Sequence, residues 1–410
     1  MLKTIVGTTS VGLLLWLARE TCPHWAAITI VLVPAVFGLF PYVSVRSLIF
    51  TNLFFAVTLF TIQRVRSGRY RAAFLFPLVM ALWTNLHGGF PAGLGILGVV
   101  AACDLVEAAW RRDRLPWALP VVALAGAAAT MLSPYGPSYL RTAFAFGTMS
   151  RAEISEWQPF HLGLLHDTPT FAAIPLLIGM AVLAIMTSRR VKSMGDLVLL
   201  TMTGLLALWH VRHSPFFLLT CLWLLPGYLA ASRWMPKSGS RFGFLVFAVA
   251  AELACVRTFY AWQAGWHLSV PADAFPVQAM EFMRDEGVTG NVAVDFNWGS
   301  YLIGTCYPSC LVSFDGRLEE VFPAHLRALS FALQDGTAGW DRLLVDYPTD
   351  IVLLPVKRPG VNRIAATPGW TLVYRDSVAA LFVRNTPRFA GVIERHGGSP
   401  ASAAPVDDRL

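Results

Sequence analysis

The sequence predicts an α-helical polytopic membrane protein with about ten short transmembrane helices, followed by a small extracytoplasmic α/β domain at the C-terminus. Three observations predict this fold class. Hydrophobic residues make up 55% of the 410 residues and charged residues only 14%, whereas soluble domains carry roughly 25% charged residues. The apolar residues gather in runs near the length of about 20 residues that crosses a bilayer. The last third of the chain instead alternates short strand and helix patterns.

The first 256 residues contain ten apolar runs, which together form the predicted transmembrane domain, residues 1–256. Because backbone polar groups inside lipid must bond within their own segment, these runs are expected to be helices. The runs cover residues 4–18, 25–45, 47–62, 72–86, 89–109, 115–133, 171–188, 197–209, 215–231 and 242–256.

The linkers between the runs alternate in charge. Those after the third, fifth, seventh and ninth runs carry three or four Arg or Lys residues each, and the linkers between them carry two at most. Positively charged linkers stay in the cytoplasm, so everything beyond residue 257 is predicted to be extracytoplasmic. This pattern accounts for the net charge of +7. No basic stripe with interleaved aromatics is present, so nucleic acid is not expected as a partner.

Counting the alternation backward gives the first two runs their directions. The second run must travel outward and the first inward, which places Met1 outside the cytoplasm. The same pattern would arise if a further helix and loop preceded Met1.

A long outer loop, residues 134–169, carries two candidate catalytic carboxylates, Glu153 and Glu156. A carboxylate at the membrane surface could act as general base on an acceptor hydroxyl. It could also hold a divalent metal ion against a lipid pyrophosphate. The alternative is a solvated loop acid beside Trp157, an interfacial anchor. The loop segment 139–149 could lie in the interface as an amphipathic helix.

Two further outer positions are candidates for substrate binding. His87 ends the fourth run beside two glycines and could bond a phosphate or a sugar hydroxyl. The alternative is a polar helix end that tightens a turn. Arg212 and His213 lie between two apolar runs, where Arg is suited to phosphate because its forked donors stay charged. The alternative is an Arg whose stem lies along apolar surface while its charge reaches water. His87, Glu156 and Arg212 are predicted to approach one another on the outer face, because an unpaired charge near hydrocarbon is costly and is relieved by pairing or by a bound phosphate.

The tail, residues 257–393, is predicted to be the α/β domain. Strands are expected at 291–295, 310–314, 350–355, 370–375 and 379–383, and helices at 277–286, 322–335 and 340–347. Asp295, Asn297, Asp315 and Arg317 lie near strand ends, where α/β folds often bind ligands; a structural Asp–Arg pair is the alternative. Residues 394–410 are rich in Gly, Ser, Ala and Pro and are predicted to be disordered.

Six cysteines are present. Four of them lie in or beside apolar runs and are expected to behave as small apolar residues. Cys306 and Cys310 are the pair in the predicted oxidising compartment, where this spacing can close a disulfide. No second ligand pair with metal spacing follows them, which argues against zinc.

Seven segments, taken in order, resemble bacterial membrane proteins related to the GT-C glycosyltransferases, over about residues 20–385. They are RSLIF at 46–50, LWTNLHGGF at 82–90, LSPYG at 132–136, ISEWQP at 154–159, VRHSP at 211–215, FNWGSYL at 296–302 and DGR at 315–317. The resemblance implies a bacterial inner-membrane location and sugar transfer from a polyprenyl-phosphate donor on the extracytoplasmic face. Lipid and a lipid-linked sugar would be its partners.

One departure from that family concerns its catalytic acid. GT-C enzymes hold an Asp or Glu in the first extracytoplasmic loop, after the first helix, and this chain shows no such loop. Together with the backward count, this predicts that an N-terminal helix and catalytic loop precede Met1.

Three functions follow from these patterns. The first is a GT-C-like glycosyltransferase. The second is a non-catalytic relative that binds a lipid-linked glycan or a partner protein. The third is a transporter, against which the sequence shows no internal repeat and no matched pair of broken helices.

Overall fold

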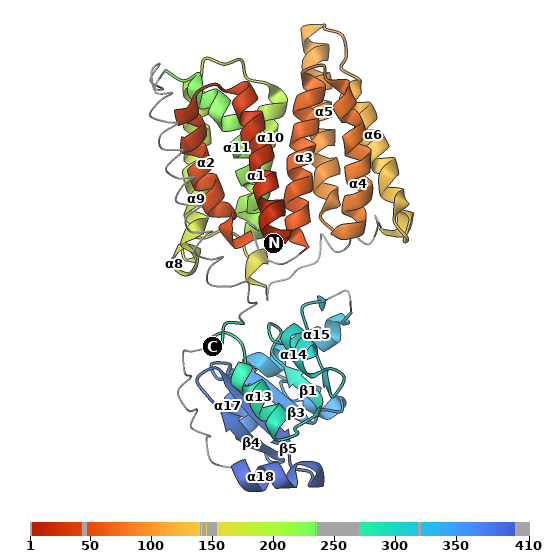
Figure 1. Ribbon diagram of the computed structural model, residues 1–410, viewed down its shortest axis with the longest axis vertical. Coiled ribbons are helices and arrows are strands. Elements are labelled where there is room, and N and C mark those ends of the chain that lie inside the picture. The colour runs from red at the N-terminus through yellow and green to blue at the C-terminus, as the bar shows by residue number, and fades with distance from the viewer. Residues whose placement is uncertain are drawn as a thin grey trace. The chain divides into compact units, whose positions relative to one another are not determined.

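A computed structural model describes residues 2–42, 47–139, 141, 145, 154–233, 235, 270–318 and 321–397. The chain divides into two compact units, Met1–Ala264 and Gly265–Leu410. The first runs from red to green and the second from teal to blue in Figure 1. The predicted division after residue 256 falls outside the described residues.

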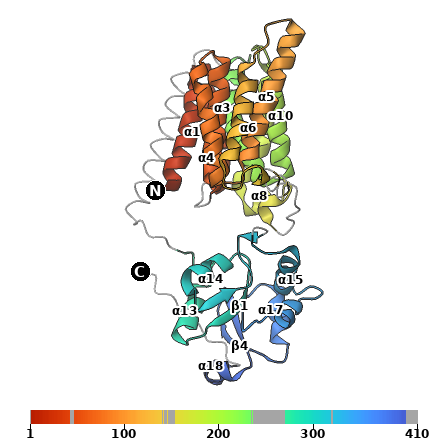
Figure 2. The same cartoon turned by 90° about the vertical axis from the view of Figure 1, so that its right-hand side faces the viewer.

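The first unit is a bundle of helices (Figures 1 and 2). Each of the first nine predicted runs corresponds to one helix, and the tenth, residues 242–256, lies outside the described residues. The helices are α1 (Leu2–Thr21), α2 (Trp25–Leu39), α3 (Leu48–Arg66), α4 (Leu75–Leu86), α5 (Phe90–Arg111), α6 (Ala118–Ala129), α9 (Ala173–Thr187), α10 (Met194–Trp209) and α11 (Ser214–Ala230).

Among the described residues, five helical segments are long and apolar enough to cross a membrane. They are Trp25–Tyr42, Leu48–Arg66, Phe90–Arg111, Pro169–Thr187 and Val211–Ala230. The segments Ala118–Leu132 and Met194–Trp209 are apolar but shorter. A membrane protein built from apolar helices is therefore supported, whereas the figure of about ten spans is not reached by length and composition.

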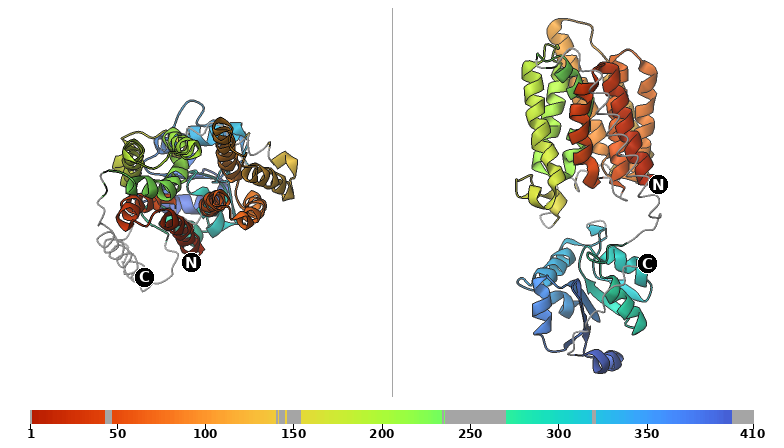
Figure 3. Two further views of the ribbon diagram at one scale, coloured as in Figure 1. Left: turned by 90° about the horizontal axis from the view of Figure 1, so that it is seen from above. Right: turned by 60° about the vertical axis from the view of Figure 1, so that its left-hand side comes forward.

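Helix α11 lies at the centre of the bundle. It packs on α1, α2, α9 and α10, and the view from above shows the helices standing side by side (Figure 3). Its sequence is apolar on all sides, which is typical of a helix surrounded by neighbours. Phe217, Leu222 and Trp223 are each at most 2% exposed.

The two ends of the bundle differ in their side chains. At one end, Arg64 in the last turn of α3 lies 3.0 Å from Glu20 in the last turn of α1. Helices α1 and α3 therefore end together and run parallel, as the backward count predicts. We call this the arginine end, after Arg64 and Arg66 in the last turn of α3. The start of α10 also lies there, because Arg66 contacts Asp196. The opposite end, with His87, His210 and His213, is the histidine end.

The second unit contains a sheet with strand order β2-β1-β3-β5-β4. Strands β1 (Gly290–Val294), β2 (Cys310–Val312) and β3 (Ile351–Pro355) are parallel. Strand β5 (Ala379–Arg384) pairs antiparallel with β3 and with β4 (Trp370–Arg375). Each predicted strand corresponds to one of these five. Because side chains alternate along a strand, Val292 and Val294 belong to one core and Ala293 to the other.

Helices cover both faces of this sheet (Figure 3, right). Helices α13 (Val277–Asp285), α14 (Gly299–Cys306) and α18 (Ala390–His396) contribute to the core that contains Val292. Helices α15 (Ala324–Asp335), α16 (Arg342–Asp346) and α17 (Pro359–Ala365) contribute to the core that contains Ala293. The sequence patterns missed α14, α17 and α18, which are at most eight residues long.

The predicted disordered tail begins too early. Residues 394–396 are the last turn of α18. Arg395 lies 2.6 Å and His396 3.1 Å from Glu286, so charge pairing ties this turn to the domain. Residues 398–410 lie outside the described residues.

Cys306 and Cys310 form a disulfide between α14 and β2, with their Cα atoms 5.4 Å apart. We expect both cysteines to resist alkylation in purified, unreduced protein and to be alkylated after the disulfide is reduced. Replacing both by serine should lower the free energy of unfolding of the domain by about 2 kcal/mol, because a short loop constrains the unfolded chain only modestly. Free thiols before reduction would contradict the pairing.

Candidate functional site

The histidine end brings together segments that are far apart in the sequence. Nη1 of Arg212 lies 3.3 Å from Oε2 of Glu156, and the Arg212 guanidinium lies 5.2 Å from the ring centroid of Trp157. Arg212 belongs to a short 3₁₀ helix, Val211–His213, and Glu156 to another, Ser155–Trp157. The structure therefore pairs an acid of the loop at residues 134–169 with the arginine that precedes α11.

Backbone hydrogen bonds hold the segment after Glu156 against the α10–α11 connection. The N–H of Phe160 donates to the carbonyl of Leu208 at 2.9 Å, and the N–H of Val211 donates to that of Gln158 at 3.2 Å. The His210 ring bonds the carbonyl of Trp157 through Nδ1. These bonds fix the position of Glu156 relative to Arg212.

His87 lies at the C-terminal end of α4 and is held by its Nδ1 atom. Nδ1 accepts the Gly89 N–H at 3.0 Å and lies 2.7 Å from the Thr51 hydroxyl oxygen. That oxygen itself accepts the indole N–H of Trp83 at 2.9 Å. The Thr51 hydroxyl therefore donates to Nδ1, and the ring proton is on Nε2. Burial, and then the charge of Arg212, lower the pKa of His87 to about 4, so a neutral His87 lies within electrostatic range of Arg212.

Stability is expected to depend on pH through His87. The folded chain binds a proton there near pH 4, whereas the unfolded chain binds it near pH 6.5. Stability is therefore full above about 6.5 and falls as pH falls from 6.5 to 4, by about 2–3 kcal/mol. A His87→Gln variant should lose less stability over the same interval, measured by denaturant unfolding in detergent. Parallel pH profiles for the two proteins would contradict this assignment.

The other candidates at this end have different outcomes. His213 packs against Phe216 and Trp157. Within the described part of the chain its buried Nδ1 has no hydrogen-bond partner. Glu153 and most of segment 139–149 lie outside the described residues. In the described ranges no group of three or more His, Cys, Asp or Glu side chains could hold a metal ion, so the suggested divalent cation gains no support there.

Two residues of this end escaped the sequence patterns. The Tyr42 hydroxyl donates to the Val211 carbonyl and ties the end of α2 to the Arg212 segment. His210 stacks on Trp209 and meets Trp157 edge to face. For His210 a signal was available, because His210 and His213 lie on either side of Arg212 in the sequence. Nothing local distinguishes Tyr42 from an interfacial tyrosine.

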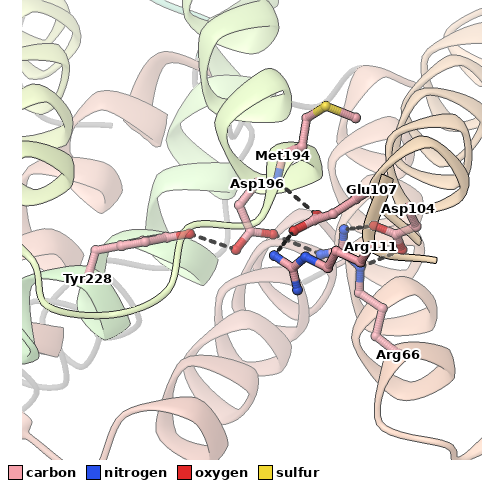
Figure 4. Close-up of polar contacts among 7 residues, drawn as sticks. All are labelled: Arg66, Asp104, Glu107, Arg111, Met194, Asp196 and Tyr228. Atoms are coloured by element: carbon pink, nitrogen blue, oxygen red, sulfur yellow. Dashed lines mark hydrogen bonds and ion pairs between the residues drawn. The ribbon is translucent and has the colours of Figure 1, made fainter. Parts of the chain in front are cut away.

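The arginine end contains a charged network that the sequence patterns also missed (Figure 4). Arg66 donates two bonds to Asp104, at 2.9 and 2.6 Å, and a third to Asp196 at 2.8 Å. The Tyr228 hydroxyl donates to the other Asp196 oxygen at 3.0 Å. Helices α3, α5, α10 and α11 are therefore joined by one guanidinium, two carboxylates and the Tyr228 hydroxyl. An acid inside an apolar run, as Asp104 is, was the available signal.

Beside this network, Glu107 of α5 links two neighbouring segments. Its carboxylate pairs with Arg111 and accepts the backbone N–H of Met194 at 3.2 Å (Figure 4). The bond to Met194 caps the first turn of α10, where an anion is favoured by the helix dipole.

In the second unit the predicted strand-end residues form internal ion pairs. Asp295, which follows β1, binds Arg358 at 2.9 Å, and Arg358 also binds Asp335 at 2.8 Å. Asp315, which follows β2, accepts both the side chain and the backbone N–H of Arg317. Burial raises the pKa of Asp315, but the bonds from Arg317 outweigh it and hold that pKa below its usual value.

These strand-end contacts agree with the structural reading of the Asp–Arg pairs. Asp295 and Asp315 are at most 1% exposed, and their carboxylates bond within the domain. Asn297 is exposed and donates its backbone N–H to Asp295. Of the predicted binding residues in this unit, only Asn297 and the half-exposed Arg317 present polar groups to solvent.

No protein-family model and no curated protein matches this chain.

Proposed function

We propose that the chain is a GT-C-like membrane glycosyltransferase whose histidine end binds a polyprenyl-phosphate-linked sugar on the extracytoplasmic face of a bacterial inner membrane. The observation that supports this most is the Glu156–Arg212 pair with His87 in electrostatic range. A cation, a carboxylate and a neutral imidazole at one end of an apolar bundle suit a charged lipid headgroup and an acceptor hydroxyl.

The pair between Arg212 and Glu156 is weak enough to be exchanged. Nη1 of Arg212 and Oε2 of Glu156 lie 3.3 Å apart, and the two side chains are 29% and 33% exposed. Such pairs contribute about 0–1 kcal/mol, so a phosphate can replace the carboxylate on Arg212. Glu156 would then act as the base that takes the proton of the acceptor hydroxyl. His87, with its proton on Nε2, would donate to a phosphate or sugar oxygen.

An apolar groove along α10 suits the lipid chain. Its volume is about 500 Å³, and its lining residues are Leu197, Val198, Thr201, Met202, Leu205, Leu206 and Trp209. The groove reaches Trp209, which stacks on His210. A polyprenyl chain along this surface would place its phosphate near the histidine end.

The test is lipid capture followed by turnover. Purified protein in nanodiscs is supplied with polyprenyl-phosphate-linked sugar, and the retained lipid is measured by mass spectrometry. Arg212→Gln should retain about tenfold less, as expected for one lost charge-assisted hydrogen bond. Glu156→Gln should retain the lipid but lower sugar transfer by about 10²–10⁴-fold. Arg141→Gln, at an exposed position of the same outer loop, is the matched control.

The second candidate is the non-catalytic relative that binds a lipid-linked glycan or a partner protein. One observation favours it: Glu156 is already paired with Arg212, and both acceptor contacts of the His87 Nδ1 atom are internal. Lipid retention by the wild type without any sugar transfer would support this candidate. Failure to retain lipid-linked sugar would contradict both candidates.

The proposed side of the membrane can be tested directly. We expect a periplasm-active reporter fused after Gly397 to be active. Helix α11 ends at the arginine end, where the basic linkers lie, and the apolar run predicted at residues 242–256 would then carry the chain across the membrane to the outer side. A cytoplasm-active reporter at the same junction should be silent. The opposite pattern would contradict the assignment of the histidine end to the outer face.

A further inference from the structure

The arginine end contains a polar cavity of about 370 Å³, which is within the size range of small-molecule sites. Its charged lining residues are Arg66, Asp104, Arg190 and Asp196. Thr21, Gln63, Ser67 and Ser193 add neutral polar groups, and Trp223 and Leu224 complete the lining. Groups of both charges line this cavity, whereas the groove along α10 is apolar.

One pole of the cavity is acidic. Arg66 gives all three of its described bonds to Asp104 and Asp196, so a single positive charge is shared by two carboxylates. The Thr21 hydroxyl donates to the backbone, at 3.1 Å to the Ala18 carbonyl, and its oxygen can therefore accept a further bond. Two carboxylates against one guanidinium leave a net negative charge, which suits an ammonium group.

The other pole is basic. Arg190 lies over the Tyr228 ring, with its guanidinium carbon 5.0 Å from the ring centroid. In the part of the chain that the structure describes, no carboxylate pairs with it. The Tyr228 ring is fixed, because its hydroxyl bonds Asp196. The ring holds the Arg190 guanidinium in place by stacking, which does not neutralise its positive charge. A guanidinium placed in this way suits a phosphate.

Two glycines make room for the two guanidiniums. A Cβ atom at Gly227 would lie 2.2 Å from Nη1 of Arg190, and one at Gly195 would lie 2.4 Å from Nη2 of Arg66. Any larger residue would displace these side chains from the positions that line the cavity.

We propose that this cavity binds a phosphate–amine zwitterion, with the phosphate on Arg190 and the primary ammonium on Asp104 and Asp196. Such a group occurs as the headgroup of phosphatidylethanolamine and as free phosphoethanolamine. The site is separate from the histidine end, so it stands independently of the proposed glycosyl transfer.

The test is a headgroup series on the full chain in detergent. Short-chain phosphatidylethanolamine, phosphatidylcholine and phosphatidylglycerol, and free phosphoethanolamine, are titrated by calorimetry. We expect phosphatidylethanolamine to bind about tenfold more tightly than the other two lipids, because only its ammonium donates hydrogen bonds to the carboxylates. Tight binding of free phosphoethanolamine would identify a soluble ligand, and binding of the lipid alone would identify a membrane lipid; both support the site.

Arg190→Gln should weaken phosphatidylethanolamine binding about tenfold. Arg189→Gln, at the exposed neighbouring position, is the matched control and should change nothing. Equal weakening by both variants would reduce the effect to general surface charge and overturn the proposal. Equal affinity for phosphatidylglycerol and phosphatidylethanolamine would also overturn it, since the acidic pole would then play no part.

Discussion

Replacing Arg66 with methionine is expected to lower the free energy of unfolding by about 3–5 kcal/mol, which is the cost of breaking a buried ion pair by removing one partner. The change leaves Asp104 and Asp196 without their cation, and the side chain of Asp196 is only 6% exposed. Methionine keeps much of the packing of the long side chain, so the loss reports on charge rather than volume. Unfolding by SDS in mixed micelles gives the measurement.

The matched control is Arg111→Met. Arg111 pairs with Glu107 one turn away on the same helix, and its side chain is 55% exposed. Exposed pairs of this kind contribute about 0.3–0.5 kcal/mol, so little should change. Adding Asp104→Asn to Arg66→Met should recover part of the stability, because one unpaired charge is removed. A loss below about 1 kcal/mol in Arg66→Met would contradict the role of the network.

Gly299→Ala is expected to destabilise the second unit by about 2–3 kcal/mol, within the range for overpacked interiors. A Cβ atom there would lie 2.1 Å from the backbone oxygen of Phe314 and 2.8 Å from the Asp315 Cβ. Backbone cannot move aside as a flexible side chain can, so α14 and the segment after β2 must separate. Hydrogen–deuterium exchange of the β1 and β3 amides in the full chain measures the loss in this unit.

Gly304→Ala is the control within the same helix. Nothing lies within 4 Å of a Cβ atom at Gly304, and alanine in a helix interior is about 0.5–1 kcal/mol better than glycine. This variant should therefore slow exchange slightly. Equal effects of the two substitutions would show that close packing at Gly299 does not limit stability.

The sequence alone located most elements, because their signals are local. A long apolar run predicts a helix within the same residues, and a short segment with strand composition predicts a strand within the same residues. Short helices with mixed composition, such as α14 and α17, were missed, since seven or eight residues carry too little periodic signal to be recognised. Charge alternation between linkers also sufficed to predict which helix ends lie together, because each linker is tied to the helices beside it.

The residues of the candidate site were likewise predicted from the sequence only in part. The sequence indicated Glu156, Arg212 and His87 as polar groups at one depth, because helix length and direction determine depth. The sequence also predicted that these three groups approach one another, and the structure pairs Glu156 with Arg212. Only the tertiary structure decided that Asp104 and Asp196 share Arg66. Those pairings depend on which helices are neighbours around the bundle. That arrangement is determined by side-chain packing between segments as far apart as residues 66 and 196, about which no local pattern carries information.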